Sequence, residues 1–349
     1  MPKVAVIVVI YNGAGFLPEL LSSLQNTTYP PDDWDLLLVD NNSQDNSIAL
    51  AKELFPQAKL FPQKENLGFA AANNLAMSYA LDNGYDYIFL LNHDTVVTPG
   101  WLEPLVNRAE SNKEIGAVQS KLMLAQKKDH INTVGNRIHF LGFGYGEASG
   151  QLDRGKYEQA RMINYPSGAA VLYRAEALRS VGLFAPQMFM YLEDLDLGWR
   201  LWLAGYQCWL DPRSIIYHKF EFSRGMTKVY YFERNRWLCI LRDYHWATLI
   251  LLFPALLMME IGQLLFAIKN GWSKDKIRSY VYFTDPLVWS ELLGQRRQIQ
   301  NQRHRTDAQM LAMFTGEILY QELASPLLLY VANPIFKFYL TIMRWLIRW

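Results

Sequence analysis

Three carboxylates lie within four residues of the segment FMYLEDLDLGWR (189–200), the strongest candidate for chemistry in the sequence. They are Glu193, Asp194 and Asp196, and Arg200 follows four positions after the last. In a helix, Asp196 shares one face with Glu193 and with Arg200, whereas Asp194 points away from the apolar stripe and can face a cleft. Clustered like charges destabilise a fold unless cations, a metal ion or a chemical task offsets them. The alternative is a solvated helix N-terminus, where acids are common.

The elements that position such residues alternate between strand and helix over residues 4–91. The β-branched run Val4–Ile10 is typical of a parallel strand buried on both faces. Ser43 or Asp45 can cap a helix that ends at Phe55. This alternation with short connections predicts an α/β fold with an open, mostly parallel, Rossmann-like sheet. The other expected elements are helices over 16–24 and 69–81 and strands over 35–39, 59–61 and 85–91.

Polar clusters follow three of the expected strands, at 11–12, 40–42 and 92–94. In open α/β sheets, ligands bind beyond the carboxyl ends of the strands, so these clusters lie where a ligand is expected. Ordinary turn and helix-entry chemistry is the alternative for each of them. Asp94 directly follows an apolar run and could hold a hard cation bound to a diphosphate. The sequence contains neither GxGxxG nor GxxxxGK[ST], which argues against a dehydrogenase or a P-loop NTPase.

Composition limits the class of protein. Of 349 residues, 51% are hydrophobic and 14% aromatic, and the net charge of +1 argues against nucleic acid as the main partner. The length predicts one large or two unequal domains. Cys208 and Cys239 have no paired spacing, so we expect neither a disulfide framework nor a cysteine-based zinc site, as in a reducing, cytosolic setting. Residues 1–10 are typical of a first strand and not of a signal peptide.

Six segments, in order along the chain, resemble the inverting family 2 glycosyltransferases with a GT-A nucleotide-sugar fold, especially rhamnosyltransferase-like bacterial members. The resemblance implies a GT-A domain over residues 1–228. The segments are VIVVIYNGAGFL (6–17), LLVDNNSQDNS (37–47), ENLGFAAANN (65–74), LLNHDT (90–95), PSGAAVLYRAEAL (166–178) and FMYLEDLDLGWR (189–200).

The resemblance implies a nucleotide-diphosphate sugar donor. Tyr11 would contact the base, Asp40 would hydrogen-bond the base or ribose, and Asn66 and Gly68 would lie where the family closes over the nucleoside. The residues implied in binding the nucleotide sugar are Tyr11, Asn12, Asp40, Asn42, Asn66, Gly68, Asn92 and Arg200.

The resemblance also implies a divalent metal ion, Mg²⁺ or Mn²⁺, at the family's DxD position. Here that motif reads Asn92-His93-Asp94, so Asp94 is its single carboxylate and the grip on the metal should be weaker or shared. His218 stands after an expected strand over 214–217, where related enzymes place a histidine that completes the metal shell. The alternative is a structural histidine.

The acid cluster gains its role from the same resemblance. In inverting transfer, an acceptor hydroxyl attacks the anomeric carbon and a carboxylate takes its proton. By similarity Asp194 is this base, Glu193 and Asp196 tune or position it, and Arg200 holds the helix electrostatically. Gly168, in an expected strand, would admit the acceptor. Glycines spaced by aromatics at 142–146 suggest either a mobile loop over the acceptor site or an ordinary surface excursion.

Residues 229–349 form an expected α-helical, membrane-associating region. The segment 246–268 carries one charge, Glu260, and is just long enough to span a bilayer. Because Pro254 and Glu260 weaken a simple span, a re-entrant or interfacial arrangement is favoured over a true span or a buried helix. The last helix, IFKFYLTIMRWLIRW (335–349), places Lys337, Thr341, Arg344 and Arg348 on one face, as in an interfacial helix on anionic lipid.

Together these patterns predict a peripheral or monotopic glycosyltransferase at the cytoplasmic face of the cell membrane. It would transfer rhamnose from dTDP-rhamnose, or a hexose from a UDP-sugar, to a lipid-linked or cell-envelope glycan acceptor. One alternative is a processive polysaccharide synthase, because Glu233-Arg234-Asn235-Arg236-Trp237 resembles the QxxRW signature with Glu in place of Gln. Another is a catalytically silent membrane scaffold. The oligomeric state stays open.

Overall fold

The computed structural model describes residues 1–220, 229–319 and 326–349, and these form two compact units. The sheet unit comprises Met1–Asn136, Gly146–Phe189 and Tyr206–Phe220. The helical unit comprises Arg137–Tyr145, Met190–Gly205 and the described part of Glu221–Trp349. The domain boundary expected after residue 228 adjoins residues outside the described ranges and stays a prediction.

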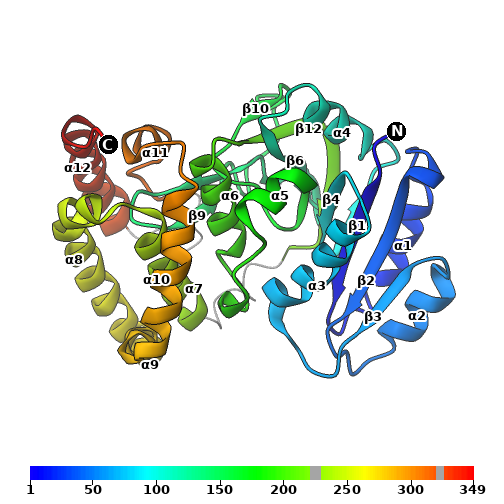
Figure 1. Ribbon diagram of the computed structural model, residues 1–349, viewed down its shortest axis with the longest axis horizontal. Helices are drawn as coiled ribbons and strands as arrows, with labels where there is room; N and C mark the ends of the chain where they lie inside the picture. Colours follow the sequence, from blue (N-terminus) through cyan, green and yellow to red (C-terminus); the bar gives the residue numbers. More distant parts are fainter. Residues whose placement is uncertain (221–228, 320–325) are drawn as a thin grey trace. The chain divides into compact units, whose positions relative to one another are not determined.

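The sheet unit is built on a mixed sheet with strand order β10-β12-β6-β11-β4-β1-β2-β3 (Figure 1). β1 pairs in parallel with β2 and β4, and β2 pairs in parallel with β3, as the alternation of strands and helices predicts. The strands are β1 (Val4–Ile10), β2 (Trp34–Asp40), β3 (Lys59–Pro62), β4 (Tyr87–Leu91), β5 (Thr95–Val97), β6 (Ile115–Leu124), β7 (Lys127–Thr133), β10 (Arg161–Met162), β11 (Ala170–Arg174) and β12 (Gln207–His218). The helices are α1 (Leu17–Gln25), α2 (Ser47–Leu54), α3 (Gly68–Asp82), α4 (Glu103–Glu110) and α5 (Ala175–Val181).

The second half of the sheet is antiparallel in part and was the harder half to predict. β11 runs antiparallel to β4 and β6, whereas β6 and β12 form a long parallel pair. β6 carries the polar run Gln119, Ser120 and Lys121, and all three side chains are buried. Ser120 and Ser214 hydroxyls bond each other across the β6–β12 pair at 2.8 Å. Buried polar residues break the apolar pattern by which a strand is recognised, so this strand was missed.

The helical unit contains α6 to α12, and its largest buried side chains are aromatic. The ring of Trp199 packs edge-on against the rings of Tyr244 and Phe314, with centroids 4.7 and 4.8 Å away. The apolar segment 246–268, for which a re-entrant or interfacial hairpin is favoured from the sequence, forms one continuous helix, α8, that ends one residue later. The helices are α6 (Glu193–Leu203), α7 (Val229–Asp243), α8 (Trp246–Lys269), α9 (Ser273–Val281), α10 (Pro286–Asn301), α11 (Asp307–Met313) and α12 (Asn333–Leu346).

The glycine-rich segment 142–146 differs from the loop expected over an acceptor. It contains β9 (Gly144–Gly146), which pairs with β8 (Asn136–Ile138), and the side chains of Phe143 and Tyr145 are buried. Gly142 has φ +83°, and a Cβ there would lie 2.8 Å from the side chain of Ile240. The glycine therefore allows close packing on α7.

Candidate active site

The loops after β1 and β2 are tied together by Asn12, through its backbone and its side chain. Its backbone N–H donates to the Ser43 hydroxyl at 3.0 Å, and its Oδ1 accepts from the Gln44 N–H at 2.8 Å. Asn12 and Asn42 have φ of 50° and 65°, a conformation that asparagine tolerates well. Tyr11 stands beside them with 45% of its surface exposed. This edge of the sheet therefore presents an open aromatic ring on a fixed backbone.

Asp40, the last residue of β2, and Asn41, the residue after it, are both buried. Asp40 carboxylate oxygens accept weakly from the Ser43 N–H at 3.3 Å. Asn41 Nδ2 donates to Asn66 Oδ1 at 2.9 Å, and Asn41 Oδ1 accepts from the Leu67 N–H at 2.8 Å. Asn41 thus joins the Asp40 loop to the start of α3. It was not among the predicted site residues, although strand alternation from Val39 could have marked it as pointing inward.

Gly68 allows an unusually close approach between α3 and the segment before α6. Its φ is +79°, and a Cβ would lie 2.6 Å from the Phe189 carbonyl oxygen. The same carbonyl accepts from the Ala70 N–H at 3.2 Å. Only glycine fits both the backbone angle and the space, which explains this position in the ENLGF segment.

Asp94 and His218 are brought together by a short pair of strands. β5 runs antiparallel to the end of β12, with Thr95 opposite His218. Asp94 is the residue before this pair, and its backbone carbonyl accepts from the Lys219 N–H at 2.8 Å. Asp94 Oδ1 therefore lies 3.2 Å from His218 Nε2, although 124 positions separate the two residues.

The chemistry of this pair fits a divalent cation. His218 Nδ1 lies 2.9 Å from Asn132 Oδ1, and if it donates there, Nε2 presents its lone pair toward Asp94. Asp94 Oδ1 is buried and accepts no well-directed hydrogen bond from the described residues. Burial alone would raise the pKa of Asp94, but His218 and His93 in their protonated forms lower it below its ordinary value. A cation bound to the His218 lone pair would supply this positive charge in place of the proton.

The protein offers this cation few ligands. The described residues contain no group of three or more His, Cys, Asp or Glu side chains able to hold a metal. One carboxylate and one imidazole are an incomplete set, which suits Mn²⁺ or Mg²⁺ shared with phosphate oxygens and water. That Asp94 and His218 hold a metal with a weak, shared grip stays a prediction.

The other residues of this edge are held by backbone contacts. Asn92 donates its N–H to the Ala169 carbonyl at 3.0 Å, and His93 Nδ1 lies 3.0 Å from the Val9 carbonyl. Gly168 was expected in a strand, but it lies in the turn before β11. The Ala170 N–H donates to the Ser167 carbonyl at 3.2 Å, and this turn bond replaces strand pairing at Gly168.

The acid cluster lies in the helical unit, at the start of α6. Glu193 and Asp196 are buried, whereas Asp194 is half-buried and is the most accessible of the three. Arg200 Nε donates to Asp196 Oδ2 at 2.9 Å, which confirms that these two residues share a face. Arg242 of α7 donates to the other oxygen, Oδ1. Asp196 is therefore held between two guanidinium groups.

The turn that leads into α6 has a strained backbone. Phe189, Tyr191 and Leu192 all have φ between 62° and 68°, which is uncommon for bulky residues and costs about 1–3 kcal/mol each. Asn235 of α7 is fully buried and donates from Nδ2 to the Met190 and Tyr191 carbonyls at 2.9 and 2.8 Å. We infer that Asn235 stabilises this conformation, and so fixes where α6 begins.

Glu193 is chemically distinct from its neighbours. Burial, together with the negative charge of Asp194, raises the pKa of Glu193 well above its ordinary value. Its Oε2 is buried without a hydrogen bond from the described residues. A proton on Glu193 would leave Asp194 beside a neutral acid instead of a second charge.

Within each unit, then, the structure brings together several predicted residues. The sheet unit joins Asp94 with His218, and the Asp40 loop with Asn66 and Gly68. The helical unit holds Glu193, Asp194, Asp196 and Arg200 on one helix.

Comparison with known proteins gives these features a context. Residues 5–182 match the family described as glycosyl transferase family 2. An N-acetylglucosaminyl-diphospho-decaprenol L-rhamnosyltransferase of Mycobacterium tuberculosis is 26% identical over 238 residues, which cover 63% of this chain and 77% of that protein. A poly-beta-1,6-N-acetyl-D-glucosamine synthase of Staphylococcus epidermidis is 25% identical, over 68% of this chain and 55% of that protein.

Solved structures show the same fold at low identity. The crystal structure of GalNAc-T7 with UDP, GalNAc and Mn²⁺ superposes with a TM-score of 0.55 at 15% identity, covering 69% of this chain and 48% of that one. Staphylococcus aureus TarS gives a TM-score of 0.51 at 16% identity, covering 73% of this chain and 43% of that one. The chain spans about half or less of these longer proteins.

Proposed function

The chain belongs to glycosyl transferase family 2, and on that premise we propose that it is an inverting enzyme that builds a cell-envelope glycan. The donor is dTDP-rhamnose or a UDP-hexose, and the acceptor is a lipid-linked or cell-envelope glycan. The observation that carries the proposal is the Asp94–His218 pair at the ligand-binding edge of the sheet. The rhamnosyltransferase relative, named for a diphospho-decaprenol acceptor, supports the acceptor class.

Asp94 and His218 would hold a divalent cation on the donor diphosphate. Such a cation stabilises the negative charge that develops on the diphosphate as the sugar leaves. A structural neighbour was crystallised with Mn²⁺ and UDP, which agrees with this use of the fold. Tyr11, Asn12, Asp40 and Asn42 would bind the nucleoside on one side. Asn66, Gly68 and Asn92 would bind it on the other. The donor contact that the family resemblance implies for Arg200, in the helical unit, stays a prediction.

Asp194 would act as the base. An acceptor hydroxyl oxygen bonds to the anomeric carbon, the bond from that carbon to the diphosphate breaks, and the hydroxyl proton passes to an Asp194 oxygen. Asp194 is the most accessible acid of the cluster, and a neutral Glu193 would place no second negative charge beside it. Asp196 would position the helix through Arg200 and Arg242 and would not touch the substrate. Gly168 would border the acceptor.

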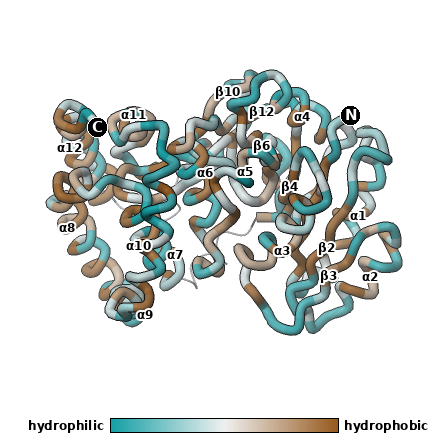
Figure 2. The backbone as a smooth tube through the Cα atoms, viewed as in Figure 1, coloured by the Kyte–Doolittle hydropathy of each residue, from teal (hydrophilic) through white to brown (hydrophobic). Residues whose placement is uncertain are grey.

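The helical unit would attach the enzyme to the cytoplasmic face of the membrane. Among the described residues, one helix, α8, is long and apolar enough to cross a bilayer. Ile250 of α8 and Phe338 and Trp345 of α12 are 73%, 68% and 70% exposed, and Figure 2 shows hydrophobic stretches along both helices. Exposed apolar faces of this size mark an interaction surface.

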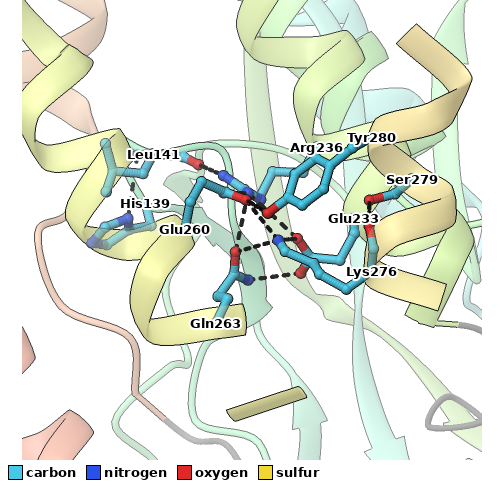
Figure 3. Close-up of polar contacts among 9 residues, drawn as sticks. All are labelled: His139, Leu141, Glu233, Arg236, Glu260, Gln263, Lys276, Ser279 and Tyr280. Carbon is cyan, nitrogen blue, oxygen red and sulfur yellow. Dashed lines mark hydrogen bonds and ion pairs between the residues drawn. The ribbon is translucent and has the colours of Figure 1, made fainter. Parts of the chain in front are cut away.

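The pairing of Glu260 favours a helix that lies on the membrane over one that crosses it. Glu260 forms ion pairs with Arg236 and Lys276 and accepts from the Tyr280 hydroxyl (Figure 3). Burial alone would raise the pKa of Glu260, but the two cations lower it to about 2. α8 thus uses one face for protein contacts and leaves the other for lipid.

The basic stripe expected on α12 is partly occupied within the protein. Arg344 donates to the Leu311 and Phe314 carbonyls, and Lys337 forms an ion pair with Glu317 at 3.1 Å. The attraction to the membrane would therefore come mainly from apolar residues.

Two measurements test the proposal. A thermal-shift screen of nucleotide sugars with and without Mn²⁺ should find one nucleobase whose stabilisation requires the metal. Asp194→Asn should lower transfer by about 10²–10⁴-fold while leaving that thermal shift in place. Asp275→Asn, at another half-buried acid in the first turn of a helix, is the control and should keep full activity. Full turnover by Asp194→Asn would refute the assignment of the base.

The synthase relatives make processive transfer the second candidate. The length of the product formed on a defined primer separates the two functions. Addition of one sugar excludes a processive synthase, whereas a ladder of products supports it.

A further inference from the structure

An open groove runs along one side of the helical unit, with a volume of about 780 Å³. This is within the range of sites that bind small molecules. Its walls come from α8, from the start of α7, and from Pro326–Ala332 with the first turn of α12. Most of the lining is aliphatic, aromatic or methionine, including Phe232, Met258, Leu265, Phe266 and Phe336. Methionine and aromatic walls adapt to the shape of an apolar guest.

The polar side chain of Gln263, in the groove lining, already has hydrogen-bond partners within the protein. Its Nε2 donates to Glu233 Oε1 at 2.7 Å (Figure 3). Its Oε1 accepts from Lys276 at 2.8 Å and from Arg236 at 3.1 Å. Gln263 is therefore satisfied by the protein. Among the described residues of the lining, Lys269 carries the charge.

The groove opens onto the exposed apolar face of the unit. Leu265 is 63% exposed and Leu327 is 69% exposed, and both line the groove. A guest therefore enters from the same apolar phase that would cover α8 and α12. The part of α8 from Met258 to Lys269 measures about 17 Å at 1.5 Å per residue, which gives the groove the form of a channel for a chain.

One end of the groove adjoins the helix that carries the acid cluster. α7 and α8 are antiparallel, because Arg236 pairs with Glu260 and Glu233 with Gln263. Phe232, one residue before Glu233, therefore lies on the Lys269 side of the Glu233–Gln263 contact. The Phe232 ring also packs on the ring of Tyr191, 6.3 Å between centroids, three positions before Asp194.

We propose that this groove holds the isoprenoid chain of a polyprenyl-diphosphate-linked acceptor, with the phosphate end toward Lys269 and Phe232. This inference rests on the proposed function, since it assigns the lipid part of that acceptor. The isoprenoid chain is apolar, and the diphosphate joined to one end of it is anionic. These two properties match a groove with apolar walls and a lysine at one end. That end also points the glycan toward the turn that leads into Asp194.

The test uses a benzophenone-bearing farnesyl diphosphate on the full-length protein in nanodiscs of phosphatidylcholine and phosphatidylglycerol. Irradiation should label peptides from residues 258–269 and 326–336, and unlabelled farnesyl diphosphate should compete. Gly262→Leu should lower this labelling about tenfold, the loss expected when roughly two buried methylene groups are displaced. Gly262 lines the groove, and a Cβ there meets nothing within 4 Å, so the new side chain enters the groove without a clash.

Gly294→Leu is the matched control. Gly294 lies inside α10, its Cβ would also meet nothing within 4 Å, and it does not line the groove. Both changes replace a helical glycine with a better helix former, so neither should unfold the protein. Labelling of Gly294→Leu should equal that of the wild type.

Two results would overturn the inference: labelling that is unchanged in Gly262→Leu, or labelling that falls when the phosphatidylglycerol fraction of the nanodisc is raised. The second would mean that an anionic phospholipid, with its headgroup at Lys269, occupies the groove instead. Release of nucleotide from the donor sugar, measured in the same samples, reports on the proposed function separately. Turnover with labelling outside the groove rejects the groove alone, and groove labelling without turnover rejects the transferase assignment alone.

Discussion

Two carboxylates, one in each unit, are used in opposite ways. In the sheet unit, Asp94 faces an imidazole nitrogen at 3.2 Å, and its buried Oδ1 receives no well-directed hydrogen bond from the described residues. In the helical unit, Asp196 is held by Arg200 and Arg242, one on each oxygen. Glu260 of the same unit has two cationic partners and a tyrosine hydroxyl.

This difference distinguishes a carboxylate that can bind a ligand from one that supports the fold. A buried carboxylate whose charge is compensated by protein cations is part of the structure, and removing one partner destabilises the fold. A carboxylate with an unfilled oxygen at a ligand-binding edge is available for a cation or substrate. Residue type alone does not make this distinction, because both kinds of acid follow or begin ordinary secondary structure.

The largest expected effect tests the structural half of this comparison. Arg242→Met leaves Asp196 buried with one cation fewer, and we expect the free energy of unfolding to fall by about 3–5 kcal/mol. Urea unfolding followed by far-UV circular dichroism measures it. The double variant Asp196→Asn with Arg242→Met removes both charges and should recover much of the loss. A stable Arg242→Met protein that had lost activity would instead place this pair in the chemistry.

The variant Asp94→Asn tests the ligand-binding carboxylate of the comparison. Removing this charge should lower transfer by about 10²–10³-fold, because the cation loses its carboxylate ligand and an electrostatic contact of this kind is worth that much. The free energy of unfolding should fall by no more than about 0.5 kcal/mol, since a neutral His218 leaves no buried protein cation behind. Activity is measured over a series of Mn²⁺ concentrations, and a higher half-saturating concentration is expected. A large loss of stability would make Asp94 a structural acid like Asp196.

A pair of glycine variants tests how the donor edge is shaped. Gly68→Ala places a methyl group 2.6 Å from the Phe189 carbonyl, whereas Gly84→Ala places one in open space, and both positions have positive φ. Gly84→Ala therefore measures the backbone cost alone, about 1 kcal/mol. Gly68→Ala should cost about 1–3 kcal/mol more, because Phe189 must move. It should also raise the KM for the donor sugar. Equal losses of stability in the two variants would show that the close contact with Phe189 carries no cost.

Local patterns predicted the elements that are locally determined. β1 follows from an uninterrupted apolar run, and the order of strands and helices predicted the parallel half of the sheet. The polar strand β6 was missed because its buried Gln119, Ser120 and Lys121 are satisfied by distant residues, which no local pattern reveals.

The candidate site also combines local motifs, which the sequence reveals, with distant partners, which it does not. The six segments of the family resemblance supplied the residues, but the partners come from far away in the sequence. Arg242 lies 46 positions from Asp196, and strand pairing brings His218 to Asp94. For the same reason Glu260 looked costly from the sequence, and its cations, 24 positions before and 16 positions after it, remove that cost.

The smallest expected effect concerns Glu193, which belongs to neither half of the comparison. Its pKa is raised in the folded protein, so the protonated carboxyl contributes stability that is full below the unfolded pKa and is lost as the pH rises through the folded pKa. Glu193→Gln cannot ionise. Its melting temperature should exceed that of the wild type by a margin that grows from pH 5 to pH 8, about 2–4 °C for each 1 kcal/mol of stability that the wild type loses.

Differential scanning fluorimetry between pH 5 and pH 9 measures this gap, with Glu291→Gln on the exposed face of α10 as a control that should show none. Because the charge of Asp194 is the second cause of the shift, Asp194→Asn should lower the pKa of Glu193 and narrow the gap between Glu193→Gln and its parent. A gap that is absent at every pH would mean that Glu193 is as well compensated as Asp196. If this melting-temperature difference is the same in the Asp194→Asn background, burial alone keeps the proton on Glu193. The protonation of Glu193 would then not change when Asp194 accepts a proton from the acceptor.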